Sequence, residues 1–454
     1  MGDIHRVARR AREGLILKAR TLVLPPRPVV IRAALWLVFL GPFFYASYGL
    51  ANYLASVRGA VPNIAMQWER AIPFMAWTII PYWSINLFYV ATLFFNVTPQ
   101  DVDRIAKRYL TCQLIAVAFF ILFPLRAIFE KPETGGLTGF MFGALGSFDK
   151  PFNQAPSLHI ALLVIIWDHW RGRFSGSMAW IWHGWSALIG LSVLTTFQHH
   201  VMDIPTGALL GFFALWLFPE EEARRETRGE EIGGKRNKIG ALYAAGSGFF
   251  LLVAVFTLRL SPLSLLWLWP ALSLALIAAA YLWLGVPVFQ KRPDGTISRA
   301  AFWLLMPYRW GARINAWAWT RKLPPSAHVF GNVWLGRVPR GSEARGFGAV
   351  IDMTGEMIAP KGAGVEVKAF PLLDLAAPNA EVLRVAADAI EAAQARGKSL
   401  VCCALGMQRS AAAAGAWLVR AGHARNGAEA LAILRKSGRP VRLDAALIDS
   451  VLEP

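Results

Sequence analysis

A cysteine and an arginine with five residues between them, Cys403 and Arg409, lie in the stretch "SLVCCALGMQRSAAAAG". This stretch is predicted to form a buried strand, a tight loop and a helix. A thiolate can attack phosphorus, and the N–H groups of such a loop and helix start stabilise it. Gly406 permits the turn, Arg409 can hold two phosphate oxygens, and Ser410 offers a hydroxyl to the departing thiolate. The spacing therefore predicts phosphate chemistry at a cysteine, although such a pair also occurs by chance.

This chemistry also needs a general acid that protonates the leaving oxygen. Asp374, in "FPLLDLAAP" after a predicted strand, is the best candidate. The alternative for Asp374 is a turn residue that ends the strand. Asp352, in "VIDMTGE", is interpreted as a turn or cap residue.

A second group of chemically active residues lies far upstream, at the starts of two apolar segments. Ser157 and His159 lie in "QAPSLHIALL", and His199 and Asp203 lie in "LSVLTTFQHHVMDIPTG". An aspartate four residues after a histidine can orient the imidazole and stabilise its charged form. Two histidines suffice for phosphoryl transfer, because one attacks phosphorus and the other protonates the leaving oxygen. His200 is the rival nucleophile.

Basic side chains have to hold the phosphate at such a site. Arg126 and Lys131 lie in the loop before "PSLH" and are the candidates. The alternative for each histidine is an interfacial residue that is hydrogen-bonded to backbone or to a lipid headgroup. We favour that alternative for His169 and His183.

The composition indicates a membrane protein. The 454 residues are 55% hydrophobic and include 19 Trp, with a mean hydropathy of +0.41. The net charge of +18 lies beside apolar segments, which favours anionic lipid headgroups over nucleic acid as partners. Three cysteines, Cys112, Cys402 and Cys403, are too few for a disulfide framework. The sequence has no metal-ligand cluster, and we predict neither a metal nor a cofactor.

About eight segments are predicted to cross a membrane, since a span needs about 20 apolar residues. They lie near 33–55, 72–96, 108–128, 157–170, 178–197, 203–218, 239–259 and 263–286. The distribution of Lys and Arg in the short loops places both termini inside. We therefore predict an integral membrane protein, of the bacterial inner membrane, with the histidine site outside and the thiol site in the cytosol.

Five regions are predicted along the chain. Residues 1–32 are a basic cytosolic segment without a signal-peptide cleavage site, and residues 299–322 mix Trp with Arg. This second stretch is either an amphipathic helix in the membrane interface or a linker helix packed on the next domain. The remaining boundaries are 33–218 for a six-helix membrane domain, 219–286 for a cytosolic loop and two additional spans, 287–325 for a linker, and 326–454 for a soluble α/β domain.

Residues 326–454 resemble the dual-specificity branch of the protein tyrosine phosphatases. The resemblance rests on "CALGMQRS", on "FPLLDL" upstream and on "GRPVRL" downstream. It implies that Cys403 is the nucleophile through a phosphocysteine, that Arg409 clamps the phosphate and that Asp374 is the acid. The family usually has His before the nucleophile, where this chain has Cys402, and a regulatory bond between Cys402 and Cys403 is one hypothesis.

Residues 33–218 resemble the type-2 phosphatidic acid phosphatase superfamily, in its branch near the inositol phosphorylceramide and sphingomyelin synthases. The resemblance rests on "PSLH" and on the pattern from His199 to Asp203, with a Gln-His pair before the Asp. It implies that His199 forms a phosphohistidine, that Asp203 is its partner and that His159 is the acid.

Three positions depart from that superfamily's pattern. Leu158 stands for Gly, Val193 stands for Arg after Ser192, and Lys131-Pro132 stands for Arg-Pro. These departures favour transfer of a phospho-headgroup over broad phosphatase activity.

We therefore predict a bifunctional membrane phosphatase that acts on lipid phosphates or phospho-headgroups outside and on phosphomonoesters inside. Its partners would be membrane phospholipids. The alternatives are an inositolphosphotransferase-like enzyme with a regulatory phosphatase domain, and a lipid-binding receptor without catalysis.

Overall fold

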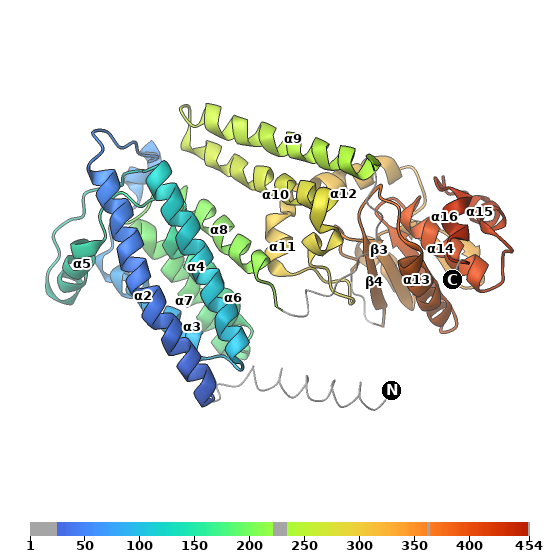
Figure 1. Cartoon of the computed structure of the whole chain (residues 1–454), viewed down its shortest axis with the longest axis horizontal. Helices are drawn as coiled ribbons and strands as arrows, with labels where there is room; N and C mark the ends of the chain where they lie inside the picture. Colours follow the sequence, from blue (N-terminus) through green and yellow to red (C-terminus); the bar gives the residue numbers. More distant parts are fainter. Residues whose placement is uncertain (1–24, 221–233, 361–363, 453–454) are drawn as a thin grey trace. The chain divides into compact units, whose positions relative to one another are not determined.

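The computed structural model describes residues 25–220, 234–360 and 364–452, and the predicted segment 1–32 lies mostly outside them. The chain divides into two compact units (Figure 1). One comprises residues 1–218 and 253–268, and the other comprises residues 219–252 and 269–454.

The first unit is built from helices. They are α2 (Arg27–Ser56), α3 (Ile79–Phe94), α4 (Pro99–Leu122), α5 (Gly136–Phe148), α6 (Leu158–Arg171), α7 (Gly176–Thr195) and α8 (Asp203–Leu217). Helix α2 packs on α4, α6 packs on α8, and α3 packs on α7. Sequence reasoning treated the residues of α5 as part of a loop.

Two glycines bring α8 against α6. A Cβ added at Gly207 would lie 2.4 Å from the carbonyl oxygen of Ser157, and one at Gly211 would lie 2.6 Å from that of Ala161. The close approach puts the first residue of α8, Asp203, beside the residue that precedes α6, Ser157. The backbone N–H of Ser157 accordingly donates to the carbonyl oxygen of Asp203, at 3.3 Å.

Among the described residues, four helices are long and apolar enough to cross a membrane. They cover Arg27–Ser56, Pro99–Leu122, Arg236–Thr257 and Pro262–Leu284, at four of the predicted spans. The other four predicted spans fall on α3, α6, α7 and α8, which are 14 to 20 residues long. The total of eight spans therefore stays a prediction.

The second unit contains a five-stranded sheet. Its strands are β1 (Ser326–Phe330), β2 (Val333–Arg337), β3 (Ala349–Thr354), β4 (Glu366–Leu372) and β5 (Ser399–Cys403), in the spatial order β1-β2-β5-β3-β4. Strand β1 is antiparallel to β2, and the other pairs are parallel. Gly331, at φ +53°, makes the turn of the hairpin between β1 and β2.

Helices cover both faces of this sheet. One face carries α13 (Ala380–Gln394), α14 (Arg409–Arg420), α15 (Gly427–Lys436) and α16 (Ala445–Asp449). These helices share a core with Ile351 and Val401. The alternating strand residues Val350 and Leu400 pack on the other face against Ala316 of α12 (Met306–Thr320).

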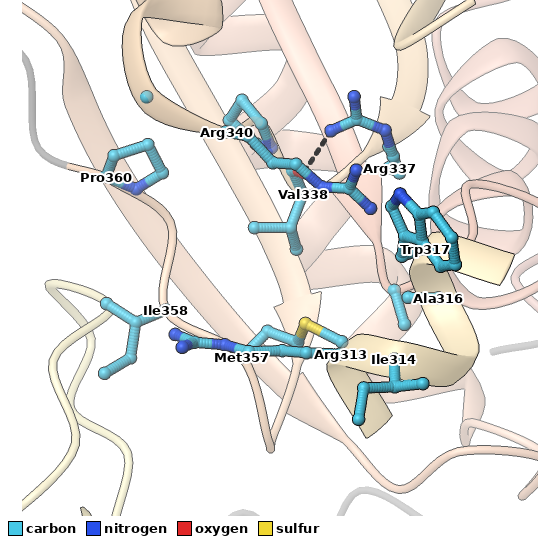
Figure 2. A pocket seen from close by; sticks show the side chains of 13 residues that line it. Arg313, Ile314, Ala316, Trp317, Arg337, Val338, Arg340, Met357, Ile358 and Pro360 are labelled. Carbon is cyan, nitrogen blue, oxygen red and sulfur yellow. Dashed lines mark hydrogen bonds between the residues drawn. The ribbon is translucent and has the colours of Figure 1, made fainter. Parts of the chain in front are cut away.

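The stretch that mixes Trp with Arg forms α11 (Arg299–Leu304) and α12. Helix α12 is amphipathic: Tyr308 and Ala316 are buried, whereas Ile314 and Trp317 are exposed. Figure 2 shows Ile314, Ala316 and Trp317 on this helix. It therefore packs on the domain as a linker helix, and it also presents tryptophans of the kind that suit a membrane interface.

Candidate active sites

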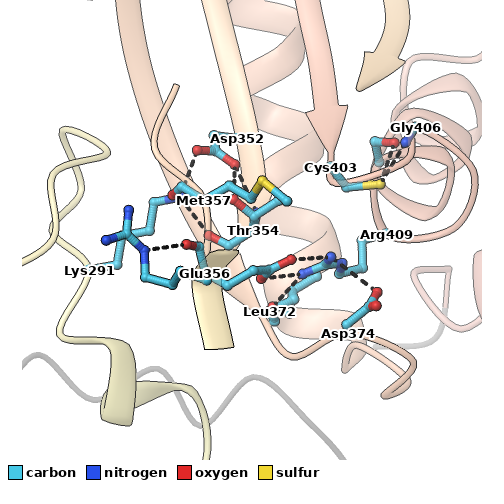
Figure 3. Close-up of polar contacts among 12 residues, drawn as sticks. Lys291, Asp352, Thr354, Glu356, Met357, Leu372, Asp374, Cys403, Gly406 and Arg409 are labelled. Atoms are coloured by element: carbon cyan, nitrogen blue, oxygen red, sulfur yellow. Dashed lines mark hydrogen bonds and ion pairs between the residues drawn. The ribbon is translucent and has the colours of Figure 1, made fainter. Parts of the chain in front are cut away.

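The first candidate site is the loop between β5 and α14. Strand β5 ends at Cys403, and α14 begins at Arg409. The Cys403 sulfur accepts hydrogen bonds from the Gly406 backbone N–H and from the Ser410 hydroxyl, each at 3.2 Å (Figure 3). Two donors from the loop and from the start of α14 thus converge on one buried sulfur.

The loop needs glycine at residue 406. Gly406 has a φ of +72°, and an added Cβ would lie 2.4 Å from the carbonyl carbon of Gly336. Buried Arg439, from "GRPVRL", donates from Nε to the Gly406 carbonyl at 3.1 Å and from Nη2 to that of Leu405 at 2.7 Å. Arg439 was not among the predicted site residues, although a motif of the resemblance contains it.

Arg409 is buried and almost fully hydrogen-bonded. Its Nη1 donates to Glu356 Oε2 and to the Leu372 carbonyl oxygen, both at 2.9 Å. Its Nη2 donates to Glu356 Oε1 at 2.7 Å and lies 3.1 Å from Asp374 Oδ1. An arginine has five N–H groups, and the fifth, on Nε, is buried without a hydrogen-bond partner among the described residues.

Glu356 is a second residue of this site that sequence reasoning missed. Burial raises the pKa of its carboxyl, but the charge and hydrogen bonds of Arg409 outweigh burial and hold it below the ordinary value. Burial likewise opposes the charge on Arg409, but Glu356 and then Asp374 raise the pKa of its guanidinium. The Glu356–Arg409 pair is therefore ionised at neutral pH.

Asp374 lies in the loop after β4, at the same end of the sheet as Cys403. It is partly exposed, and its carboxylate contacts Arg409. Its backbone carbonyl oxygen accepts a hydrogen bond from the Tyr281 hydroxyl at 2.8 Å. The next residue, Leu375, has a φ of +60°, so the chain turns sharply here. The structure thus brings Asp374 together with the predicted residues of the cysteine loop.

Asp352 does what we predicted of a turn or cap residue, because its Oδ1 accepts from the Thr354 backbone N–H two residues on, at 2.9 Å, but it also forms an ion pair that we did not predict. It lies within β3, where Lys291 Nζ donates to its Oδ2 at 2.6 Å, and both side chains are fully buried. Lys291 also donates to the carbonyl oxygens of Thr354 and Met357. A buried ion pair therefore fixes the loop that carries Glu356 (Figure 3).

Cys402 and Cys403 point to opposite faces of the sheet. Cys402 packs with the α12 side, and Cys403 packs with the α14 side. Both are free, and burial together with the charge of Asp352 raises the pKa of the Cys402 thiol well above its usual range. This arrangement does not favour the hypothetical bond between the two cysteines.

The second candidate site is in the helical unit. His199 Nε2 lies 3.1 Å from Ser157 Oγ, and His199 Nδ1 lies 3.1 Å from Asp203 Oδ2. All three side chains are buried. The Ser157 hydroxyl also accepts from the Ile160 N–H at the start of α6. A serine, a histidine and an aspartate thus form a continuous chain of polar contacts.

His200, the rival nucleophile, faces a different partner. Its Nδ1 lies 3.0 Å from Glu69 Oε2, with both side chains 1% exposed, and its backbone N–H donates to Asp203 Oδ2. Glu69 also accepts from the Val201 N–H at 3.2 Å. Sequence reasoning missed Glu69, which here fixes the segment around His199.

His159 and His199 line one cavity of about 160 Å³. The His159 ring stacks on Tyr82 with centroids 4.2 Å apart. Lys131 lines a neighbouring cavity of about 190 Å³ that also reaches His199. Arg126 is exposed and lines neither cavity. The structure therefore brings Lys131, but not Arg126, toward the histidines.

The two histidines that we interpreted as structural have different surroundings. His183 Nδ1 accepts a hydrogen bond from Trp167 Nε1 at 3.0 Å. The His169 ring lies against the edge of Trp170, with centroids 5.4 Å apart. Neither histidine lines the two cavities beside His199.

Comparison with known proteins finds no matching family model and no matching curated protein. Solved structures do match part of the chain. PTPMT1 in complex with PI(5)P is 20% identical, with 29% of this chain and 94% of that chain covered and a TM-score of 0.26. Tk-PTP in its active form is 30% identical, with coverages of 29% and 95% and a TM-score of 0.25. OH1 from the Orf virus, a tyrosine phosphatase, is 21% identical, with coverages of 32% and 95% and a TM-score of 0.23. The similarity to phosphatases covers under a third of the chain in each case.

Proposed function

We propose that the chain is a bifunctional membrane phosphatase whose cysteine site hydrolyses phosphomonoesters, those of phospholipids above all. The observation that carries this proposal is the pair of donors on the Cys403 sulfur, in a loop that ends at Arg409. The loop N–H groups and the start of α14 supply the positive field that a phosphate requires.

In the proposed reaction the Cys403 thiolate attacks phosphorus, and the bond between phosphorus and the leaving oxygen breaks. Protonated Asp374 gives its proton to that oxygen, so an alcohol departs and a phosphocysteine remains. Water then attacks the phosphocysteine while the Asp374 carboxylate takes its proton. Inorganic phosphate leaves, and the thiolate is restored with a hydrogen bond from Ser410.

The histidine site supports a second activity on lipid phosphates or phospho-headgroups. The observation that favours it is the chain of contacts from Ser157 through His199 to Asp203, beside a cavity that His159 also lines. If the serine hydroxyl donates to Nε2, the proton on His199 lies on Nδ1 and faces Asp203. Once a substrate displaces the serine, Nε2 would attack phosphorus, the bond between phosphorus and the leaving oxygen would break, and His159 as the acid would give that oxygen a proton.

The acceptor in the second half of that reaction is water or the hydroxyl of a lipid alcohol. Water would make the site a lipid phosphatase, and an alcohol would make it a transferase with the cysteine domain in a regulatory role. A receptor without catalysis is the remaining alternative. The chain has Cys403 with Arg409 at one site and His199 with Asp203 at the other, and the presence of both nucleophiles with their partners favours an enzyme.

The test measures phosphate release from a panel of lipid phosphates by the full chain in detergent micelles. Cys403→Ser and His199→Ala are compared with the neighbouring substitutions Cys402→Ser and His200→Ala. We expect each of the first two to abolish a different activity and Cys402→Ser to spare both. If neither Cys403→Ser nor His199→Ala changes any turnover, both assigned nucleophiles are wrong.

An inert wild-type protein would call for a second assay, in which transfer of a phospho-headgroup to diacylglycerol or ceramide is followed by thin-layer chromatography. If the wild type transfers the headgroup and His199→Ala does not, the histidine site is a transferase. A protein inert in both assays would favour the receptor.

A further inference from the structure

A groove of about 620 Å³ lies between α12 and the loops that follow β2, β3 and β5 in the second unit. Figure 2 shows Arg313 and Ile314 of α12 on one side and Arg337 and Arg340 on the other. Ala404, the residue after Cys403, also lines it, but the Cys403 side chain does not. The groove is therefore separate from the position of the reacting phosphate.

Three guanidinium groups line this groove. Arg337 is 7% exposed and pairs with Glu343 at 2.8 Å and 2.9 Å, and its Nε is buried without a hydrogen-bond partner. Arg313 and Arg340 are exposed, and neither guanidinium forms an ion pair with a described residue. The Glu343 carboxylate thus pairs with one of the three cations, which leaves an excess of positive charge for an anion.

The rest of the lining is apolar. Ile314 and Trp317 come from α12, 66% and 51% exposed, and Met357 and Ile358 come from the loop after β3. A free phosphate ion would contact only the arginines, and the apolar side chains of the groove would stay exposed to water. A molecule with an anionic head and a hydrocarbon chain would use both, because burial of apolar area adds to the charge interaction.

Helix α12 is also anchored on segments apolar enough to enter a membrane. The Tyr308 N–H donates to Ser273 Oγ at 3.4 Å, and the Tyr308 ring lies 5.6 Å from the Tyr243 ring. Ser273 and Tyr243 belong to the two apolar helices of this region, Pro262–Leu284 and Arg236–Thr257. Exposed tryptophans follow along the same helix, as expected beside lipid headgroups.

We propose that this groove binds the headgroup of an anionic phospholipid, with Arg313 and Arg340 on the phosphate and the chain along Ile314 and Trp317. Such a lipid would hold the cysteine domain at the membrane surface through a site distinct from catalysis. The proposal rests on the groove alone and does not require either proposed reaction.

The experiment uses the full chain in a nonionic detergent, with His199→Ala as the background. Dihexanoyl phosphatidylglycerol is the probe, because it is anionic, stays monomeric and carries no phosphomonoester. Binding is measured by isothermal titration calorimetry. We expect saturable binding that the double substitution Arg313→Gln and Arg340→Gln weakens by about tenfold or more. Arg345→Gln, an exposed arginine outside the groove, should leave the affinity unchanged.

Three further arms test the identity of the ligand. Ile314→Asp should weaken binding without removing an arginine, and it replaces the double variant if that variant unfolds at a lower temperature than its parent. Dihexanoyl phosphatidylcholine should bind about tenfold more weakly, because its choline group faces the arginines. Glycerol phosphate should also bind more weakly, because it has no chain. Equal binding by the double variant, by phosphatidylcholine or by glycerol phosphate would overturn the proposal.

Discussion

Replacing Glu356 with Gln tests whether the buried pair with Arg409 orients the guanidinium. Gln keeps one acceptor oxygen for Arg409. Its NH2 group replaces the other oxygen, so two hydrogen-bond donors face each other there. The two side chains are 1% and 2% exposed, so water does not compensate. Removing one partner of a buried pair costs roughly 3–5 kcal/mol. The retained Gln oxygen and the contact of Arg409 with Asp374 reduce this to about 2–3 kcal/mol.

This loss should appear in catalysis, because a guanidinium that has lost its orientation cannot meet the phosphate oxygens in the right geometry. Since about 1.4 kcal/mol corresponds to tenfold, kcat/KM should fall by roughly 30- to 150-fold. The assay is hydrolysis of p-nitrophenyl phosphate by the full chain in detergent. Thermal unfolding, followed by tryptophan fluorescence, reports any accompanying loss of stability.

The matched control is Asp388→Asn, which removes another carboxylate–arginine pair of the same domain. Asp388 lies 3.0 Å from Arg420, but the two side chains are 65% and 35% exposed. Such a surface pair contributes about 0–1 kcal/mol to stability. Arg420 is at the end of α14, and the Cys403 loop is at its start. We therefore expect unchanged turnover. If Glu356→Gln retained turnover as Asp388→Asn does, the inference that Glu356 positions Arg409 would be wrong.

Three other outcomes follow from the same geometry. Folding lowers the pKa of Glu356, so the Glu356–Arg409 pair contributes its full stability at pH values above 4.5, the ordinary pKa of glutamate. This contribution is lost as the pH falls through the pKa of Glu356 in the folded state. The difference in unfolding temperature between wild type and Glu356→Gln should shrink below pH 4.5, and a difference that stays constant in acid would contradict the pairing. Gly406→Ala should reduce p-nitrophenyl phosphate hydrolysis at least about tenfold, because the new methyl group would clash with the Gly336 carbonyl. The control is Gly422→Ala, at a glycine with a similar φ of +76° but with open space around it, and it should leave this hydrolysis unchanged. Asp203→Asn should lower turnover at the histidine site by roughly 10²- to 10⁴-fold while sparing p-nitrophenyl phosphate, and an equal fall in both activities would argue against two separate sites.

The cysteine loop could be predicted because its parts are contiguous. Cys403, Gly406, Arg409 and Ser410 act through one turn, so their spacing in the sequence is also their arrangement in space. Glu356 could not be predicted in the same way. It lies 53 residues before Arg409, and the two meet only because β3 and β5 are neighbours in a parallel sheet.

The ion pair of Asp352 was missed for a related reason. A carboxylate within a strand reads as a turn residue when its partner is unknown, and Lys291 lies 61 residues upstream. In the helical unit, the spacing of His199 and Asp203 indicated their contact, whereas Glu69, 131 residues before His200, left no local signal. Partners distant in the sequence require the tertiary fold, which strand order and helix packing determine.

The hydrogen bonds of Arg409 constrain how a substrate could bind at the cysteine site. Its four Nη N–H groups are used by Glu356, the Leu372 carbonyl and Asp374, and the Nε N–H has no partner. Asp374 is the acceptor that a ligand can displace, since it is 34% exposed whereas Glu356 is 2% exposed. In the proposed reaction, a phosphate would take Nε and the Nη2 donor that Asp374 holds, so two parallel hydrogen bonds replace one. The same exchange frees the Asp374 carboxylate beside the bound phosphate, where it takes up a proton from water and can then protonate the leaving oxygen. Phosphate binding and delivery of the acid would then be one event, with Glu356 as the fixed support of both.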